Sequence, residues 1–235
     1  SMAVRLLFPT FVFEKDLLDP SLDPNRGIDQ NYLDLLVDTM DGMRRKDPQG
    51  RRLSNAYTGW QSHDGCESNP AFQKIMNRIQ TMFYDEIWPF HGLDRNKAQM
   101  QIGNSWANIN DKLAWNKPHL HNGCWYSGVF YIKADGDEGH IEMIDTNPKV
   151  VSDFPNSPRT PTSKGYEPRS GKLILFPSGL MHMVEPNPTD KERYSISFNI
   201  EMKYTSSEGH SGNIDNYNPD EFVYNISPNG QLITD

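Results

Sequence analysis

Hydrophobic positions follow a helical period in the first third of the chain. Apolar residues recur at three- and four-residue spacing between positions 33 and 43, which gives one apolar stripe and an opposite polar face. A second stripe follows Asn69, a good N-cap, and Pro70, which suits the first helical position. Its members are Phe72, Ile75, Met76, Ile79, Met82 and Phe83. We expect two amphipathic helices within a helical region of residues 28–90.

The pattern changes to strands from residue 98 onward. Segments 124–133, 140–144, 172–177 and 194–204 are rich in β-branched and aromatic residues and are bounded by Gly, Pro or Asp-Gly turns. The last segment alternates strictly, with Ile196, Phe198, Ile200 and Met202 on one face and Ser195, Ser197, Asn199 and Glu201 on the other. Helices followed by strands predict a mainly β protein, a sandwich or barrel buttressed by the N-terminal helices.

Two stretches carry no regular pattern. Residues 145–171 contain five prolines and are longer than ordinary connections, so they predict a binding loop or a flexible excursion. The tail after Ser206 is polar and rich in Asn, Asp and Gly, and we expect it to be poorly ordered or to lie along the surface. The prediction is therefore one domain, residues 1–235, with a barrel core at 98–204 and a polar tail at 205–235.

Composition narrows the class of protein. The 235 residues carry 31 acidic against 23 basic side chains, a net charge of −8, which argues against direct binding to nucleic acid. No apolar run approaches the roughly 18 residues of a membrane span. Only two cysteines, Cys66 and Cys124, are present, which fits a reducing cytoplasm. We expect a soluble cytoplasmic protein, and an oligomer is compatible with the sequence.

Three histidines could form a metal site. His119 and His121 follow Pro118 in an extended segment, where residues two apart point to the same face. His182 lies after a turn, at the start of a later strand. Imidazole suits iron, zinc, copper or nickel, and three protein ligands leave room for a substrate. Taken alone, each histidine could equally be part of a polar strand face or a hydrogen-bonded structural residue.

An arginine strengthens the case for a site. Arg193 and Ser195 share the polar face of the alternating strand, and the opposite apolar face should pack on the helices. The polar face is then expected to line the barrel interior beside the metal. A buried arginine with a neighbouring hydroxyl is suited to bidentate capture of a carboxylate, whereas a surface salt bridge is the simpler alternative.

These motifs together resemble the iron(II)- and 2-oxoglutarate-dependent oxygenases of bacteria and their phages, a family related to the prolyl hydroxylases. The resemblance covers about residues 98–203 and extends weakly to Phe8-Pro9. It rests on Pro118-His119-Leu120-His121, on the segment 125–131 (WYSGVFY), on Phe176-Pro177-Ser178 with His182, and on the segment 192–199 (ERYSISFN).

The resemblance implies a double-stranded β-helix (jelly-roll or cupin-like) fold and a hydroxylase that uses Fe(II), 2-oxoglutarate and O2, with ascorbate as a candidate further cofactor. His119 and His182 would be iron ligands. His121 stands where the superfamily usually has Asp or Glu, and a carboxylate from Glu142 or Asp145 is the alternative third ligand. Arg193 would bind the distal carboxylate of 2-oxoglutarate, accompanied by three residues matched to cosubstrate contacts, namely Ser195, Tyr131 and Asn108.

The substrate and two rival functions stay open. Related hydroxylases modify prolyl residues, so a peptide or protein laid against residues 145–171 is one candidate substrate and a small metabolite is another. Aromatic residues could clamp it, namely Trp106, Trp115, Trp125 and Tyr126. Pro177-x-Gly179-x-x-His182 also resembles a cupin motif, so a three-histidine cupin enzyme that does not use 2-oxoglutarate is one rival, although the expected Glu after His121 is missing. A non-enzymatic β-barrel binding module is the other.

Overall fold

The computed structural model of the protein describes residues 2–56, 58–148, 157–205, 218 and 220–233. The first helix that the sequence predicted is present among them. Helix α1 spans Gln30–Lys46, and the Asp29 side chain caps it by accepting from the Tyr32 backbone N–H. Its buried stripe consists of Tyr32, Leu33, Leu36 and Met40, which packs into the main core. The periodicity of the sequence predicted this helix correctly.

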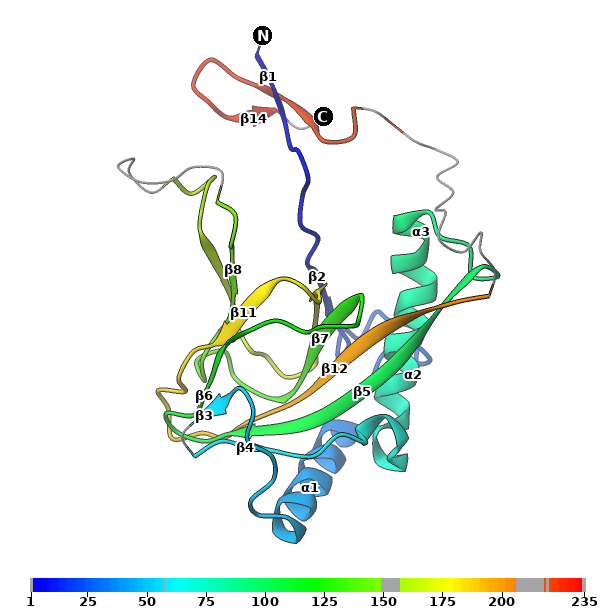
Figure 1. Ribbon diagram of the computed structural model, residues 1–235, viewed down its shortest axis with the longest axis vertical. Helices are drawn as coiled ribbons and strands as arrows, with labels where there is room; N and C mark the ends of the chain where they lie inside the picture. Colours follow the sequence, from blue (N-terminus) through cyan, green and yellow to red (C-terminus); the bar gives the residue numbers. More distant parts are fainter. Residues whose placement is uncertain (1, 57, 149–156, 206–217, 219, 234–235) are drawn as a thin grey trace.

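The second predicted helix is built from several consecutive turns. Asn69 caps a 3-10 turn, η2 (Pro70–Phe72), which leads into α2 (Gln73–Met82). A π-helical turn, η3 (Phe83–Ile87), and the short α3 (Trp88–His91) continue it, and Gly92, with φ of 67°, ends it. A further 3-10 turn, η1 (Cys66–Ser68), precedes it. Figure 1 shows α1 and α2 on the same side of the long strands, which they cover.

Two antiparallel sheets form the barrel part of the molecule. The six-stranded sheet has the order β2-β10-β7-β12-β5-β4, and the five-stranded sheet has the order β3-β6-β11-β8-β9. The strands of the first are β2 (Phe13–Asp16), β10 (Lys172–Pro177), β7 (Tyr126–Lys133), β12 (Arg193–Tyr204), β5 (Ala98–Asn110) and β4 (Trp60–Gln61). Those of the second are β3 (Asn55–Ala56), β6 (Trp115–His119), β11 (Met181–Val184), β8 (Ile141–Ile144) and β9 (Ser163–Tyr166).

The six-stranded sheet separates two cores. Its outer face packs on the helices through residues that include Ile196, Phe198 and Ile200 of β12, as the alternation predicted. Its inner face packs against the second sheet through a smaller cluster, Val129, Tyr131, Ile141, Met143, Ile174 and Phe176. Because Ser195 and Ser197 share that inner face, the polar side of β12 points into the space between the sheets.

Two stretches predicted to be irregular contain strands. Within 145–171, β9 pairs with β8, so residues 163–166 extend the second sheet; residues 149–156 lie outside the described residues. In the tail, β13 (Val223–Ile226) and β14 (Leu232–Ile233) form a three-stranded sheet with β1 (Met2–Arg5). The prediction of an irregular tail was wrong there, because the pairing partner comes from the opposite end of the chain.

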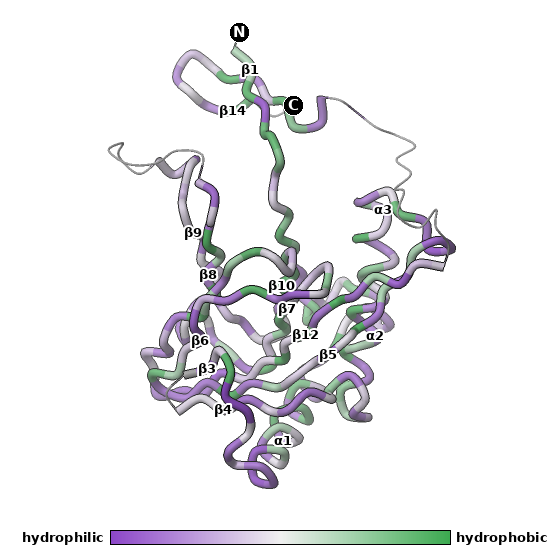
Figure 2. The backbone as a smooth tube through the Cα atoms, in the orientation of Figure 1, coloured by the Kyte–Doolittle hydropathy of each residue, from purple (hydrophilic) through white to green (hydrophobic). Residues whose placement is uncertain are grey.

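The sheet formed by the two chain ends stands apart from the barrel (Figure 1). The connection from β1 toward β2 is largely hydrophobic (Figure 2), and its Leu7 and Phe8 side chains are exposed. Across the described residues, no helix is long and apolar enough to cross a membrane.

Candidate metal and cosubstrate site

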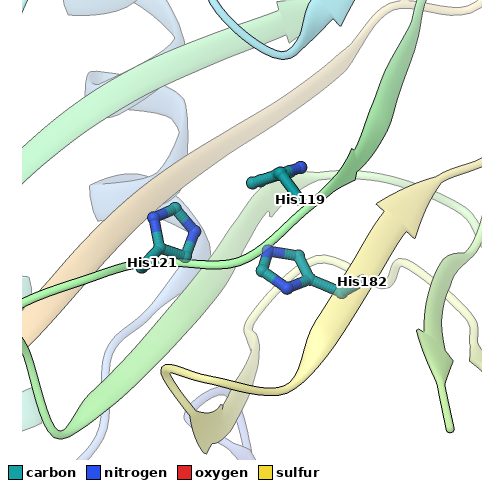
Figure 3. Close-up of side chains that lie close together, drawn as sticks. All are labelled: His119, His121 and His182. Atoms are coloured by element: carbon teal, nitrogen blue, oxygen red, sulfur yellow. The ribbon is translucent and has the colours of Figure 1, made fainter. Parts of the chain in front are cut away.

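Two of the predicted metal ligands face each other across neighbouring strands. His119 ends β6, and His182 lies in β11 as its direct partner in the antiparallel register. The sequence predicted that His121 lies on the same strand as His119. In the structure, His121 lies in the loop that follows β6, and its backbone N–H donates to the Ser178 carbonyl. Figure 3 shows the three imidazole rings gathered in one place. One ligand nitrogen from each lies within 4.8 Å of the other two.

Backbone carbonyls set the tautomers of two of these rings. Nδ1 of His119 lies 2.5 Å from the Lys117 carbonyl oxygen, and Nδ1 of His182 lies 2.9 Å from that of Leu180. A carbonyl oxygen can only accept, so each Nδ1 carries the proton and donates it. Nε2 of each ring therefore keeps its lone pair, which is the state a metal ligand requires.

Burial keeps the cluster neutral. Loss of solvation, with a smaller contribution from nearby His119, lowers the pKa of His182 to about 3. The same two causes lower the pKa of His121 to about 4, and burial also lowers the pKa of His119. At neutral pH the three rings are thus uncharged donors, and the donor set fits a borderline divalent metal such as Fe(II).

The two alternative carboxylates are not part of this group. Ile141 and Met143 of β8 point into the inner core, whereas the Glu142 side chain lies against Gly165 of β9. The Asp145 carboxylate accepts from the Asn147 backbone N–H. Among the described residues, the cluster of possible ligands consists of the three histidines.

A cavity connects the histidines with Arg193. The Arg193 side chain is buried (3% exposed), and its Nη1 donates to the Gly139 carbonyl. Its Nε is buried and has no hydrogen-bond partner. Burial lowers the pKa of Arg193, opposed by Tyr131 and Glu138. A buried guanidinium with an unused donor inside a cavity fits an anionic ligand such as a carboxylate.

The other three predicted cosubstrate residues form one row across the sheet. Ser195 on β12 lies directly opposite Asn108 of β5 on one side and Tyr131 of β7 on the other. All three line the cavity, and the Arg193 guanidinium carbon lies 5.8 Å from the centre of the Tyr131 ring. Burial raises the pKa of Tyr131, so its hydroxyl keeps its proton.

Three polar cavity residues were missed. Ser197 receives a hydrogen bond from the Asn108 amide (3.0 Å), and its place in the alternating strand could have revealed it. Asn116, on β6, accepts from the Asn110 amide and donates to Ser54. Nothing in the sequence points to Ser54, which reaches the cavity because β3 pairs with β6.

The predicted aromatic clamp is only partly in place. Trp106 lines the cavity, with its ring centre 5.8 Å from that of His121. Trp125 and Tyr126 instead pack against Trp88 and His91 in the helix-side core. They fill space between the sheet and the helices and do not line the cavity.

Comparisons with known proteins agree with this geometry. Residues 104–199 match a family model described as "Putative 2OG-Fe(II) oxygenase", where 2OG is 2-oxoglutarate. No curated protein matches the chain. AviO1 from Streptomyces viridochromogenes Tue57 is similar in structure (TM-score 0.54, 12% identity, 81% of this chain and 89% of that one). So is HygX from Streptomyces hygroscopicus, solved with nickel, 2-oxoglutarate and hygromycin B (TM-score 0.52, 11% identity, 82% and 83%).

A prolyl-4-hydroxylase from Pseudomonas putida also matches (TM-score 0.47, 17% identity, 80% and 91%). At 11–12% identity, the similarity to AviO1 and HygX concerns the fold alone, and it confirms the predicted double-stranded β-helix. Residues 104–199 of this chain thus match the model of a 2OG-Fe(II) oxygenase family, and the matched residues include all three histidines and Arg193.

Proposed function

We propose that the protein is an Fe(II)- and 2-oxoglutarate-dependent oxygenase that hydroxylates a C–H bond of a peptide residue or a small metabolite. The observation that carries this proposal is the cavity with three neutral imidazoles on one side and a buried Arg193, with an unpaired Nε, on the other. The family match at residues 104–199 supports it independently.

His119, His121 and His182 would hold the iron. Bound there, iron with 2-oxoglutarate and O2 supplies the oxidising chemistry that no amino-acid side chain can provide. Three imidazoles add no negative charge, so the site keeps the full charge of the cation. A dianionic cosubstrate compensates this charge, which favours its binding beside the metal.

Arg193 would orient the cosubstrate. Removing a guanidinium from water is costly unless its donors are used, and Arg193, which lines the cavity, has one buried donor, Nε, without a partner. A carboxylate on Arg193, with the row of Ser195, Tyr131 and Asn108 beneath it, would fix one end of 2-oxoglutarate. The fixed end leaves the oxo-acid end for the histidine side of the cavity. Arg193 and its neighbours would thereby set the position of the cosubstrate.

The substrate is the open part of this proposal. HygX is similar in fold and its structure holds hygromycin B, so a small molecule is as compatible with this architecture as a peptide. Ascorbate is a candidate reductant for repeated turnover. A cytoplasmic location fits the two free cysteines, Cys66 and Cys124, and we expect neither membrane nor direct nucleic-acid partners.

The test is spectroscopic and precedes any knowledge of the substrate. Purified protein loaded anaerobically with Fe(II) should develop a visible charge-transfer band when 2-oxoglutarate is added, and succinate should form once O2 is admitted. Metal binding without such a band would favour the cupin-type enzyme. Loss of all metal binding would favour a β-barrel binding module.

A further inference from the structure

A short segment closes the gap between the two sheets beside the histidines. The Arg51 backbone N–H donates to the Gln61 carbonyl at the end of β4, and Asn55 pairs with Asn116 of β6. Residues 51–55 therefore cross from the edge of the six-stranded sheet to the edge of the five-stranded sheet. Ser54, within this segment, lines the cavity.

The Arg51 side chain lies over an aromatic wall of the cavity. Its guanidinium carbon is 5.8 Å from the centre of the Trp106 ring. That ring is in turn 5.8 Å from the His121 ring, centre to centre. A single aromatic side chain, Trp106, thus lies between Arg51 and a proposed metal ligand, His121.

Arg51 shares one rare property with Arg193. Within the described part of the chain, two buried side-chain nitrogen or oxygen atoms have no hydrogen-bond partner, and they are Nε of Arg51 and Nε of Arg193. Nη2 of Arg51 pairs with Asp64 at 2.8 Å, and the Arg51 side chain is 23% exposed. An unused buried guanidinium donor is costly, so a ligand that accepts from it stabilises the site.

We infer that Arg51 and Trp106 form the substrate-recognition subsite, and that the substrate carries a carboxylate close to the carbon that is oxidised. The carboxylate would accept from Nε of Arg51, and the adjoining apolar part of the substrate would pack on the Trp106 ring. An arginine fixes a carboxylate by its planar fork of donors, which a lysine cannot reproduce. This inference rests on the proposed function and names its substrate class.

The carboxylate could belong to an acidic side chain of a peptide or to a small carboxylic acid, and binding separates these sources. Protein loaded with Zn(II) and 2-oxoglutarate is followed by NMR at the arginine Nε–H groups, and the Arg51 peak is assigned by its loss in Arg51→Gln. The probes are end-blocked peptides rich in Asp and Glu, the same peptides with Asn and Gln, N-acetyl amino acids, and their amides. We expect the Arg51 Nε–H peak to shift when either the peptides rich in Asp and Glu or the N-acetyl amino acids are added. It should not shift when the matched amides are added.

Turnover gives the second readout. Succinate formation stimulated by the acid that binds should fall about tenfold or more in Arg51→Gln. It should stay unchanged in Arg45→Gln, which removes one positive charge from an exposed position at the end of α1. Asp64→Asn frees Arg51 from its charged partner and should lower the KM for the same acid.

Two results would overturn the inference: no movement of the Arg51 peak with either class of acid, or equal movement with the amides. The 2-oxoglutarate band of wild-type protein is the separate check on the proposed function. If that band forms but the Arg51 peak does not shift, only the inferred substrate class is wrong. If the band is missing, the proposed function itself has failed.

Discussion

His119 and His182 are direct partners across β6 and β11, and their ring centres are 4.3 Å apart. Antiparallel pairing thus fixes the relative position of two proposed metal ligands that are 63 residues apart in the chain, the difference between positions 182 and 119. The carbonyls of Lys117 and Leu180 fix the tautomer of each ring. The two imidazoles are therefore held in a fixed arrangement in the metal-free protein, which favours tight binding of a metal ion.

Removing one ligand should abolish both metal and cosubstrate binding. We expect His182→Ala to weaken Fe(II) binding by more than the roughly 10–100-fold that loss of an outer-shell partner costs, and to eliminate the 2-oxoglutarate band. Calorimetric titration of the metal-free protein measures the first effect. His63→Ala is the matched control, because His63 is exposed and lies outside the cluster. Unchanged Fe(II) affinity in His182→Ala would contradict the metal site.

Changes at Arg193 should separate the cosubstrate from the metal. Arg193→Ala removes charge-assisted hydrogen bonds to a carboxylate, so 2-oxoglutarate affinity should fall by about 10- to 200-fold while Fe(II) affinity is kept. Arg193→Lys keeps the charge without the planar fork and should fall between wild type and Arg193→Ala. Both affinities are measured on the same anaerobic samples. Equal loss of Fe(II) in Arg193→Ala would indicate a folding defect instead.

The sequence predicted well where a pattern repeats along one segment. The α1 stripe and the alternation in β12 each follow from local geometry, and they placed Arg193 and Ser195 on the inner face correctly. The position of a residue relative to segments distant in the sequence was harder to predict. His121 lies in a loop held by the Ser178 carbonyl, and no periodicity describes such a contact.

Residues brought in by short or distant pairings could not be predicted. Ser54 and Arg51 belong to a segment whose strand, β3, has only two residues, too few for any alternation. The tail strands β13 and β14 have four and two residues, and β13 pairs with β1 from the other chain end and with β14. Their formation depends on long-range pairing, which a local sequence window does not contain.

Stability of the metal-free protein should fall with acid in a defined window. His182 and His121 have folded-state pKa values of about 3 and about 4, below the ordinary value near 6.5. Between about pH 6.5 and 4, these histidines bind protons in the unfolded chain but stay neutral in the folded protein. Their full contribution to the free energy of unfolding is therefore present above about pH 6.5 and is progressively lost below it. Each histidine contributes up to about 1.4 kcal/mol per pH unit.

Urea unfolding at several pH values measures this effect. In His182→Gln, the free energy of unfolding should decrease less between neutral and acid pH than in wild type, because one of the groups whose pKa differs between the folded and unfolded states has been removed. His63→Gln, at an exposed position, should keep the wild-type dependence. Identical slopes for wild type and His182→Gln would refute the assignment of the acid sensitivity to the cluster.

A glycine on β7 should be intolerant of any side chain. Gly128 lies opposite Phe198 of β12, and a Cβ at this position would be 2.3 Å from the end of the buried Phe198 ring. Because Phe198 is enclosed by the helix-side core, the ring cannot move away freely, and Gly128→Ala should destabilise the fold by about 1–3 kcal/mol. Gly179→Ala is the control, since a Cβ there has nothing within 4 Å. Equal unfolding midpoints for the two variants would show that the ring can be displaced at little cost, and that this wall of the barrel is softer than its packing implies.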